Sequence, residues 1–485
     1  MSDAGRILVV DVGTSSVRAV VHDADGTAIH GVGRPLAPET PADGLVEFDA
    51  ALMATTCLEL AITALEAVGP VAAVGVSNQR GSTVVWDRAT GRPVGPGLGW
   101  QDLRTVGDCL VLRGEGLRVA PNQSATKAKW LLDQAGPDAR DRDLCVGTVD
   151  AWIVHALSGG SAHVTDASNA AITGLLATDA DTGWDATALA AVGVPPTMMP
   201  TVVDSAGIVA EARALPGAPP IAAIIGDQQA SLVGQGCVRP GPAKITFGTG
   251  GMLDLVVDDR PTFAGRGSAG TFPIVARRVA GELTWGVEAI MLAAGTNVQW
   301  LCDDLGLAAS PAETHELAAA CADTGGVVFV PALLGLGTPH WDYGARGTLL
   351  GLTRGSGRAE IVRAVLEGVA HRGADLVEAA ETDTGRAIPV LRVDGGMTDN
   401  PTFVQALADA AQRPVEVSPV REATAKGAAL LAALAVGLHD SIDDLAATWA
   451  PRARIEPTRT LDRDRWRDAV ARSTAWIPEL SGIDF

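Results

Sequence analysis

Lysine is scarce in this sequence. Only four of its 485 residues are lysines, and none of them follows a glycine-rich loop. A P-loop nucleotide site needs a lysine after its glycine turn, so that kind of site is excluded. Positive charge is low overall, because 57 acidic residues outweigh 37 basic ones and leave a net charge of −20. This negative net charge argues against a nucleic acid or an anionic membrane as partner. Any bound polyphosphate must be held by groups in its immediate surroundings, because the overall charge repels it.

The sequence contains no zinc-type cysteine pattern, and we expect neither a leader nor a membrane span. The six cysteines are scattered and form no C-x-x-C pair, which excludes the usual zinc patterns and favours reduced thiols in the cytoplasm. Asp11 interrupts the first apolar run, so no secretory leader is expected. The most apolar later stretch, residues 427–438, is too short to cross a bilayer and is interpreted as a buried helix. We expect no membrane insertion.

The material for a large core is present. Hydrophobic residues make up 47% and charged residues 19% of the chain, which is typical of a compact globular protein. A chain of 485 residues is too long for one ordinary core, so two or more domains are expected. Residues 237–243 are the predicted boundary, which divides the chain into domains 1–238 and 239–485. No flexible linker is found, so the domains are expected to pack directly.

Two segments share an unusual design. Residues 7–26, ILVVDVGTSSVRAVVHDADG, predict a strand, a Gly-Thr-Ser turn and a second strand, with Arg18 as the only cation. Such turns often hold phosphate, because backbone N–H groups and small hydroxyls close around anionic oxygens. Residues 244–259, KITFGTGGMLDLVVDD, repeat the design. The repeat indicates duplication of one domain.

The remaining pattern alternates helices and strands. Residues 48–69 predict a helix with Asp49 as N-cap. Residues 71–80 and 221–229 predict apolar strands that end in polar residues, where open α/β sheets place their ligands. Residues 391–413 predict a strand, a Gly-Gly turn and a helix begun by an Asn-Pro pair, a further candidate ligand site.

The two hairpins and the late Gly-Gly segment resemble the ATP-binding fold of actin, hexokinase and Hsp70. Nearly the whole chain is similar to the FGGY carbohydrate kinases, and within them to glycerol kinases. The resemblance implies an α/β protein of two actin-like (ribonuclease H-like) ATPase domains with the active-site cleft between them, and ATP and Mg²⁺ as cofactors. The stretches that carry it include DVGTSSVRAVV, GVSNQR, WQDLRT, HVTDASNA, GDQQASLVGQG, FGTG, GLGTPHWDYGARGTLLGLTRG and RVDGGMTDN.

The resemblance also implies roles for individual residues. Asp227 is the expected catalytic base, which accepts the proton of the acceptor hydroxyl. Asp11 and Asp227 are the residues expected at the metal ion, Asp11 through its waters. The residues expected at the nucleotide are Thr14, Ser15, Ser16, Arg18, Thr249, Gly295, Gln299, Gly396 and Asn400.

The expected acceptor pocket departs from that of glycerol kinases. The residues in common are Arg80, Trp100, Asp227 and Gln228. The departures are Gly81, where an acidic residue is usual, Asn122, where tyrosine is usual, and Met252, where phenylalanine is usual. Losing a carboxylate and two rings predicts a roomier and differently polar pocket. We therefore predict an acceptor polyol of four or five carbons (erythritol, threitol or a pentitol), and expect that restoring all three residues shifts preference toward glycerol.

Several alternatives stay open. The chain could be an authentic glycerol kinase or a ketose kinase of the xylulokinase type, although NQRGST stands where xylulokinases have Met-His-Gly. A non-catalytic actin-like sensor or scaffold is a distant alternative, for which the acceptor residues would have no use. The partner is a small polyol or sugar, and a homodimer or homotetramer is left open. Residues 371–375, HRGAD, lie within a helical run and are interpreted as helix surface.

Overall fold

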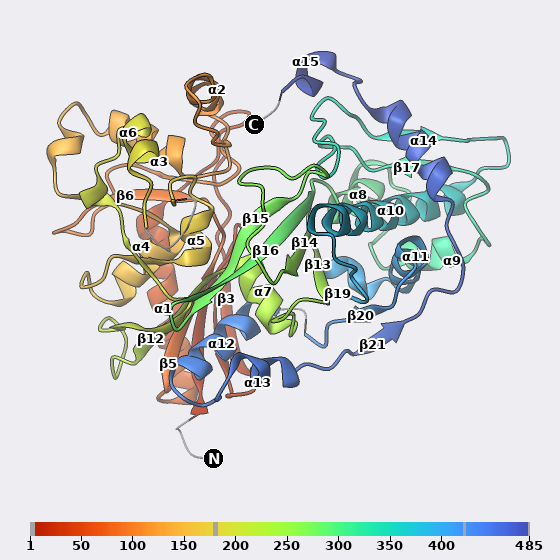
Figure 1. Ribbon diagram of the computed structural model, residues 1–485. Coiled ribbons are helices and arrows are strands. Elements are labelled where there is room, and N and C mark those ends of the chain that lie inside the picture. The colour runs from red at the N-terminus through yellow and green to blue at the C-terminus, as the bar shows by residue number, and fades with distance from the viewer. Residues whose placement is uncertain (1–4, 178–182, 421–422, 484–485) are drawn as a thin grey trace.

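The two halves of the chain lie side by side and share one sheet (Figure 1). The computed structural model describes residues 5–177, 183–420 and 423–483. The sheet has 13 strands in the order β21-β20-β19-β13-β14-β16-β15-β11-β12-β5-β1-β2-β3, so β11 and β15 form the junction between the halves. This mixed α/β architecture confirms the predicted fold class, while the division at residues 238 and 239 stays a prediction.

The strands of the large sheet fall into two sequence blocks. The first half supplies β1 (Ile7–Val12), β2 (Ser16–His22), β3 (Ala28–Pro35), β5 (Ala73–Asn78), β11 (Ala206–Glu211) and β12 (Pro220–Gly226). The second half supplies β13 (Ala243–Phe247), β14 (Gly251–Val256), β15 (Phe272–Val279), β16 (Glu282–Met291), β19 (Leu391–Asp394), β20 (Val415–Val417) and β21 (Ala453–Ile455). Smaller sheets contain β4 (Glu47–Phe48), β6 (Thr83–Asp87), β7 (Gly97–Leu98) and β8 (Leu144–Thr148); β9 (Val164–Asp166) and β10 (Thr201–Val203); and β17 (Val328–Val330) and β18 (Thr348–Leu350).

Helices pack on the large sheet and on the smaller sheets (Figure 1). Those of the first half are α1 (Ala50–Val68), α2 (Val106–Gly114), α3 (Ala125–Gln134), α4 (Val149–Leu157), α5 (Ala167–Ala171), α6 (Ala186–Val192) and α7 (Asp227–Gly234). Those of the second half are α8 (Gly295–Gln299), α9 (Glu313–Ala319), α10 (Arg358–Thr384), α11 (Pro401–Ala411), α12 (Ala423–Ala435), α13 (Ile442–Ala447), α14 (Arg463–Ser473) and α15 (Pro478–Ser481).

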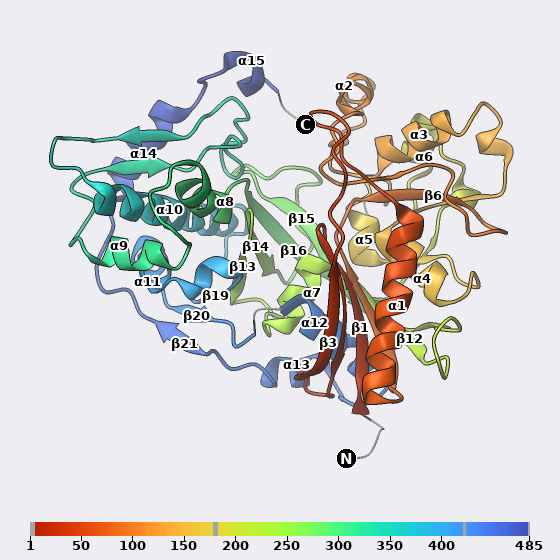
Figure 2. The ribbon, with the colours of Figure 1, turned by 180° about the vertical axis from the view of Figure 1, so that it is seen from behind.

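Helix α1 forms where its local signals predict it. The Asp49 side chain accepts a hydrogen bond from the Leu52 N–H group at 2.9 Å, and Gly69 ends the helix with φ +85°. The helix is long and apolar enough to cross a membrane, the one such helix in the described part of the chain. Its buried residues pack against β1, β2 and β3, and Figure 2 shows it lying along these strands. We therefore interpret α1 as a core helix.

Helix α12 belongs to the second half in sequence but packs against β1, β5 and β12 of the first half. There it crosses α7 at very short range. A Cβ atom on Gly427 would lie 1.8 Å from the carbonyl oxygen of Ala230. A Cβ atom on Gly234 would lie 1.9 Å from that of Ala423. Only glycine permits this approach, which holds the middle and the end of α7 against the second half.

The interpretation of residues 371–375 as helix surface is wrong. They lie in the middle of α10, and the Arg372 side chain is only 1% exposed. The reason is that α14 packs onto this stretch, with the ring of Trp466 stacked on His371 at 4.9 Å between centroids. The helical periodicity did not reveal α14 as a partner, because it follows almost a hundred residues later in the chain.

Candidate active site

Asp227 is the first residue of α7 and follows β12 directly. The predicted strand over 221–229 therefore ends three residues early, at Gly226, because a helix begins there. The Gly226 N–H group donates to the hydroxyl of Ser168 at 3.0 Å, and the Gln228 N–H group donates to Asp227 Oδ1 at 2.8 Å. The Asp227 side chain is 30% exposed. Its carboxylate is thus held at a helix start, where backbone N–H groups favour negative charge, and stays open to a ligand.

The first Gly-Thr-Ser turn joins β1 to β2 as predicted, with Asp11 opposite Arg18 in the hairpin. Asp11 Oδ2 accepts a hydrogen bond from Arg18 at 2.8 Å, and Asp11 Oδ1 accepts one from the Ser77 hydroxyl at 2.7 Å. The indole Nε1 of Trp100 donates to Thr14 Oγ1 at 3.1 Å. The structure therefore brings a predicted acceptor residue, Trp100, into contact with the predicted phosphate turn. Ser15 and Ser16 lie in this turn, exposed and half-buried respectively.

The second turn joins β13 to β14 and contacts the start of α8. The Gly295 N–H group donates to the carbonyl of Gly248 at 2.9 Å, and the Ala294 N–H group donates to that of Thr249 at 2.8 Å. A Cβ atom on Gly295 would lie 2.6 Å from the Gly248 oxygen, so glycine is required at this approach. Thr249 is exposed at the turn, and Gln299 is exposed at the end of α8. Three predicted nucleotide residues are thereby brought to one place.

The Gly-Gly segment lies between β19 and α11 as predicted, but the Asn400 side chain is engaged within the protein. Gly395 has φ +92° and presses on the end of β13, whereas a Cβ atom on Gly396 would meet nothing within 4 Å. Asn400 caps α11 by accepting from the Phe403 N–H group at 3.1 Å. Its amide also donates to Thr314 Oγ1 at 2.9 Å. Both ends of this side chain are engaged within the protein, so the open space lies beside Gly396.

Arg80 connects Asp227, the predicted base, to Glu288, a residue that the sequence analysis missed. Its Nε lies 3.4 Å from Asp227 Oδ1, and its Nη2 donates to Glu288 Oε2 at 2.6 Å. The Arg80 side chain is 12% exposed and that of Glu288 is 7% exposed. The two residues are 208 positions apart and belong to different halves. This ion pair therefore joins the halves immediately beside Asp227.

The chain of charges continues across three strands of the second half. Lys244 on β13 stands opposite Asp254 on β14, which stands opposite Glu288 on β16. Lys244 Nζ lies 2.6 Å from Asp254 Oδ2, both side chains being fully buried, and donates to Gln228 Oε1 at 2.5 Å. Together Asp227, Arg80, Glu288, Asp254, Lys244 and Gln228 form what we call the charged arch. The signal that could have revealed the charged arch was a charged residue in the interior of each of three otherwise apolar strands, Lys244, Asp254 and Glu288.

The charged arch shifts the protonation of its carboxylates. Burial raises the pKa of Asp227 above its ordinary value, and the positive charges of Arg80 and Lys244 oppose that shift without cancelling it. Burial, with the nearby negative charge of Asp254, raises the pKa of Glu288 to about 7. Burial alone would lower the pKa of Arg80, but the surrounding carboxylates outweigh it and raise the value. Raised carboxylate pKa values beside a fixed cation are frequent at catalytic sites.

Gly81 is constrained by the backbone around it. It has φ +74°, and a Cβ atom there would lie 2.4 Å from the carbonyl oxygen of Asn122. A glutamate at position 81 would therefore be strained and would clash with main chain, so the expectation that Gly81→Glu can be part of a reversal variant is wrong. The Asn122 residue is itself exposed, and Met252 is half-buried two residues from Asp254 on the same face of β14.

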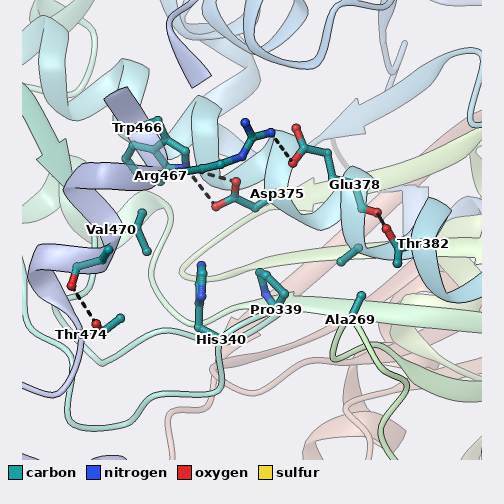
Figure 3. Close-up of a pocket in the computed structure, with 12 residues that line it drawn as sticks. Ala269, Pro339, His340, Asp375, Glu378, Thr382, Trp466, Arg467, Val470 and Thr474 are labelled. Carbon is teal, nitrogen blue, oxygen red and sulfur yellow. Dashed lines mark hydrogen bonds and ion pairs between the residues drawn. The ribbon is translucent and has the colours of Figure 1, made fainter. Parts of the chain in front are cut away.

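A separate cavity lies away from these residues, between α10, α14 and two loops of the second half (Figure 3). It has a volume of about 490 Å³, and its wall includes Pro339, His340, Glu378, Trp466 and Arg467. None of the predicted site residues lines it. The side chains around it are mostly paired with one another, as Figure 3 shows for Trp466 and Arg467.

The predicted metal ligands fit a magnesium ion held mainly by phosphate and water. No group of three or more metal-ligating side chains occurs among the described residues. Mg²⁺ commonly keeps several waters and takes one or two protein carboxylates together with substrate phosphates. The Asp11 oxygens accept hydrogen bonds from Arg18 and Ser77, which fix the carboxylate in place, and the Asp227 carboxylate is partly exposed. Two carboxylates of this kind match that need.

Comparison with known proteins agrees with this geometry. The N-terminal domain of the FGGY family of carbohydrate kinases matches residues 6–234, and its C-terminal domain matches residues 243–436. Glycerol kinase of Aromatoleum aromaticum is 43% identical over 496 residues, covering 97% of this chain and 99% of the relative. Glycerol kinase of Trichlorobacter lovleyi is 42% identical over 497 residues, covering 97% and 99%.

Solved structures of kinases have the same fold as this chain. The crystal structure of Plasmodium falciparum glycerol kinase with ADP has a TM-score of 0.89 at 27% identity and covers 96% of this chain and 98% of its own. The structure of xylulose kinase from Rhodospirillum rubrum has a TM-score of 0.85 at 24% identity, covering 98% and 99%, and shows likeness of fold. The chain belongs to the FGGY family of carbohydrate kinases and is an ATP-dependent kinase.

Proposed function

We propose that this kinase transfers the γ-phosphoryl group of ATP to a terminal hydroxyl of a small polyol, with Asp227 as the base. The observation that carries the proposal is the setting of Asp227, a partly exposed carboxylate at the start of α7 with Arg80 Nε at 3.4 Å. Phosphoryl transfer to an alcohol needs a carboxylate that orients the hydroxyl and accepts its proton. The raised pKa of Asp227 makes it a better proton acceptor than an ordinary aspartate.

The two Gly-Thr turns are proposed to hold the phosphates from opposite sides. Thr14 in the first turn is held by Trp100, and the second turn is held by the start of α8. Arg18 supplies a positive charge at the first turn. Asp11 and Asp227 would hold Mg²⁺, which neutralises charge on the transferred phosphoryl group when bound. The open space beside Gly396 suits the adenosine, and Gln299 is exposed at the end of α8, the helix whose start contacts the second turn.

For the acceptor we propose a polyol of four or five carbons. One observation supports this choice: no bulky ring stands at Asn122 or Met252, where tyrosine and phenylalanine are usual. A pocket that leaves Arg80 incompletely paired with glycerol would gain from the additional hydroxyls of a longer polyol. Each hydrogen bond to a charged group contributes about 1.5–3 kcal/mol, which corresponds to at least a tenfold preference.

Glycerol is the second candidate. It is favoured by relatives about 40% identical over nearly the whole chain that are named glycerol kinase. A ketose acceptor has less support, because the xylulose kinase likeness at 24% identity concerns the fold.

An ADP-release assay decides between these acceptors. The panel contains glycerol, erythritol, both threitol enantiomers, xylitol, D-arabitol and xylulose, each measured as kcat/KM. We expect a tetritol or pentitol to exceed glycerol at least tenfold. The matched variant is Asn122→Tyr with Met252→Phe, leaving Gly81 untouched, and it should move preference toward glycerol. A wild-type preference for glycerol over every longer polyol would contradict the choice of acceptor and leave the kinase assignment intact.

We further propose the cytoplasm as the location. All six cysteines are free thiols, and four of them are buried, which suits a reducing compartment. Assembly as a homodimer or homotetramer stays a prediction, which sedimentation would test.

A further inference from the structure

Arg80 has no acidic residue next to it in the sequence. Residue 81 is glycine, and its φ of +74° together with the Asn122 carbonyl at 2.4 Å from a Cβ position prevents any acidic replacement. An isolated arginine that is almost fully buried requires a counter-charge. The residue that meets this requirement comes from the other half of the chain, because Glu288 Oε2 accepts from Arg80 Nη2 at 2.6 Å.

The three nitrogens of the Arg80 guanidinium have different surroundings. Nη2 is bound to Glu288, Nε faces Asp227 at 3.4 Å, and Nη1 is buried with no hydrogen-bond partner among the described residues. A planar guanidinium has a rigid fork of donors, so binding one nitrogen fixes where the others point. A buried donor without a partner is costly, and a ligand oxygen would relieve that cost.

We propose that Glu288 is a positioning residue for the acceptor: by holding Arg80 Nη2 it keeps Nη1 free for a substrate hydroxyl and prevents Arg80 from closing onto Asp227. The role rests on the proposed polyol kinase function. Glu288 is itself held in place, since Asp254 stands opposite it on β14 and Lys244 neutralises Asp254 from β13. The carboxylate partner of the acceptor arginine is thus supplied by the second half, so acceptor binding depends on both halves being in register.

The test is Glu288→Gln, which keeps the shape of the side chain and removes its charge. With the polyol of highest kcat/KM as probe, we expect KM for the polyol to rise by about 10- to 100-fold, as for loss of a charged hydrogen bond. KM for ATP should stay within about twofold, because the nucleotide residues are untouched. Glu288→Asp should be intermediate. The matched control is Glu282→Gln, an exposed glutamate on the same strand, which should leave both KM values unchanged.

A double-mutant cycle separates positioning from general stability. If Glu288 acts through Arg80, then Glu288→Gln in an Arg80→Met background should raise KM for the polyol no further. Equal effects of Glu288→Gln on both KM values, or full additivity with Arg80→Met, would overturn the role. Calorimetric binding of the polyol gives the same comparison without turnover, and unchanged affinity in folded Glu288→Gln would also overturn it. Absence of ADP release by the wild type with every acceptor would instead contradict the proposed function.

Discussion

Two buried ionic clusters in this protein have opposite charge balances. In the charged arch, three carboxylates (Asp227, Glu288 and Asp254) face two cations (Arg80 and Lys244). In the cluster between α10 and α14, one buried carboxylate faces two cations, and the exposed Glu378 pairs with one of them, Arg463. There Asp375 accepts from Arg372 at 2.6 Å and from Arg463 at 2.5 Å. It also accepts from the Trp466 indole N–H group at 3.1 Å (Figure 3).

The ratio of carboxylates to cations in each cluster determines whether the pKa of a buried carboxylate is raised or lowered. Burial raises the pKa of Asp227 and of Glu288, and the cations of the arch only reduce that effect. Burial acts on Asp375 in the same direction, but Arg372 and Arg463 outweigh it and lower its pKa. The arch therefore keeps carboxylates ready to accept a proton, whereas the Asp375 cluster keeps one permanently charged. The first arrangement suits chemistry and the second suits attachment of α14 to α10.

The sharpest test of this contrast is Asp227→Asn. The amide keeps the size of the side chain but cannot accept the proton, so kcat should fall by roughly 10²–10⁴-fold. Nucleotide affinity, measured by calorimetry, should be nearly unchanged. Turnover close to that of the wild type would remove Asp227 from its role and with it the catalytic side of the comparison.

The matching change in the other cluster is Asp375→Asn. It leaves the buried Arg372 without its counter-charge, whereas Arg463 keeps Glu378 at 3.0 Å, and the free energy of unfolding should fall by about 3–5 kcal/mol. Urea denaturation measures this loss. The folded fraction should keep its wild-type kcat, because no predicted site residue touches Asp375. A loss below about 1 kcal/mol would show that the cluster is not an attachment point.

Smaller effects on stability and on KM are expected when the ion pair of the charged arch farthest from Asp227 is replaced, by Lys244→Met together with Asp254→Leu. Exchanging a complete buried ion pair for apolar residues is often neutral for stability. Gln228 loses its charged donor, so KM for the polyol should rise by about tenfold. Urea denaturation and the ADP-release assay test the two parts. An unchanged KM would mean that Lys244 has only a structural role.

The smallest effects are in the pH dependence of stability, and they have opposite signs. The lowered pKa of Asp375 contributes stability that is present above its unfolded pKa of about 4 and is lost as the pH falls through the folded value. The raised pKa of Glu288 makes stability decrease as the pH rises from about 4.5 to about 7, because the folded state binds more protons there. Each slope is at most about 1.4 kcal/mol per pH unit.

Unfolding free energies of the wild type, Asp375→Asn and Glu288→Gln between pH 3 and 8 test these signs. Asp375→Asn should flatten the acid side of the curve, and Glu288→Gln should reduce the decline toward neutral pH, to which the raised pKa of Asp150, about 6, also contributes. Parallel curves for all three proteins would contradict the assigned pKa directions.

Local elements were predictable because their causes are local. The turn residues of the hairpins at Gly13 and Gly248 and the capping residues Asp49 and Asn400 act on neighbours a few positions away, and all four occur as predicted. The resemblance of motifs in one order then indicated the family. Strand 221–229 was overextended because an apolar run cannot reveal that a helix starts at Asp227.

The sequence by itself determined the paired Gly-Thr turns and the alternation of strands and helices, and it led to the prediction of Asp227 as the base. Only the tertiary structure decided that Glu288 partners Arg80, that Lys244 reaches Gln228, and that residues 371–375 are buried under α14. Gly81 shows the difference most clearly. The sequence indicated only that a carboxylate usual at this position is missing. The structure shows that the positive φ of Gly81 and the Asn122 carbonyl disfavour any side chain there. The physical reason is distance along the chain, since charge pairing and steric exclusion depend on strand register and helix crossing, which couple residues hundreds of positions apart.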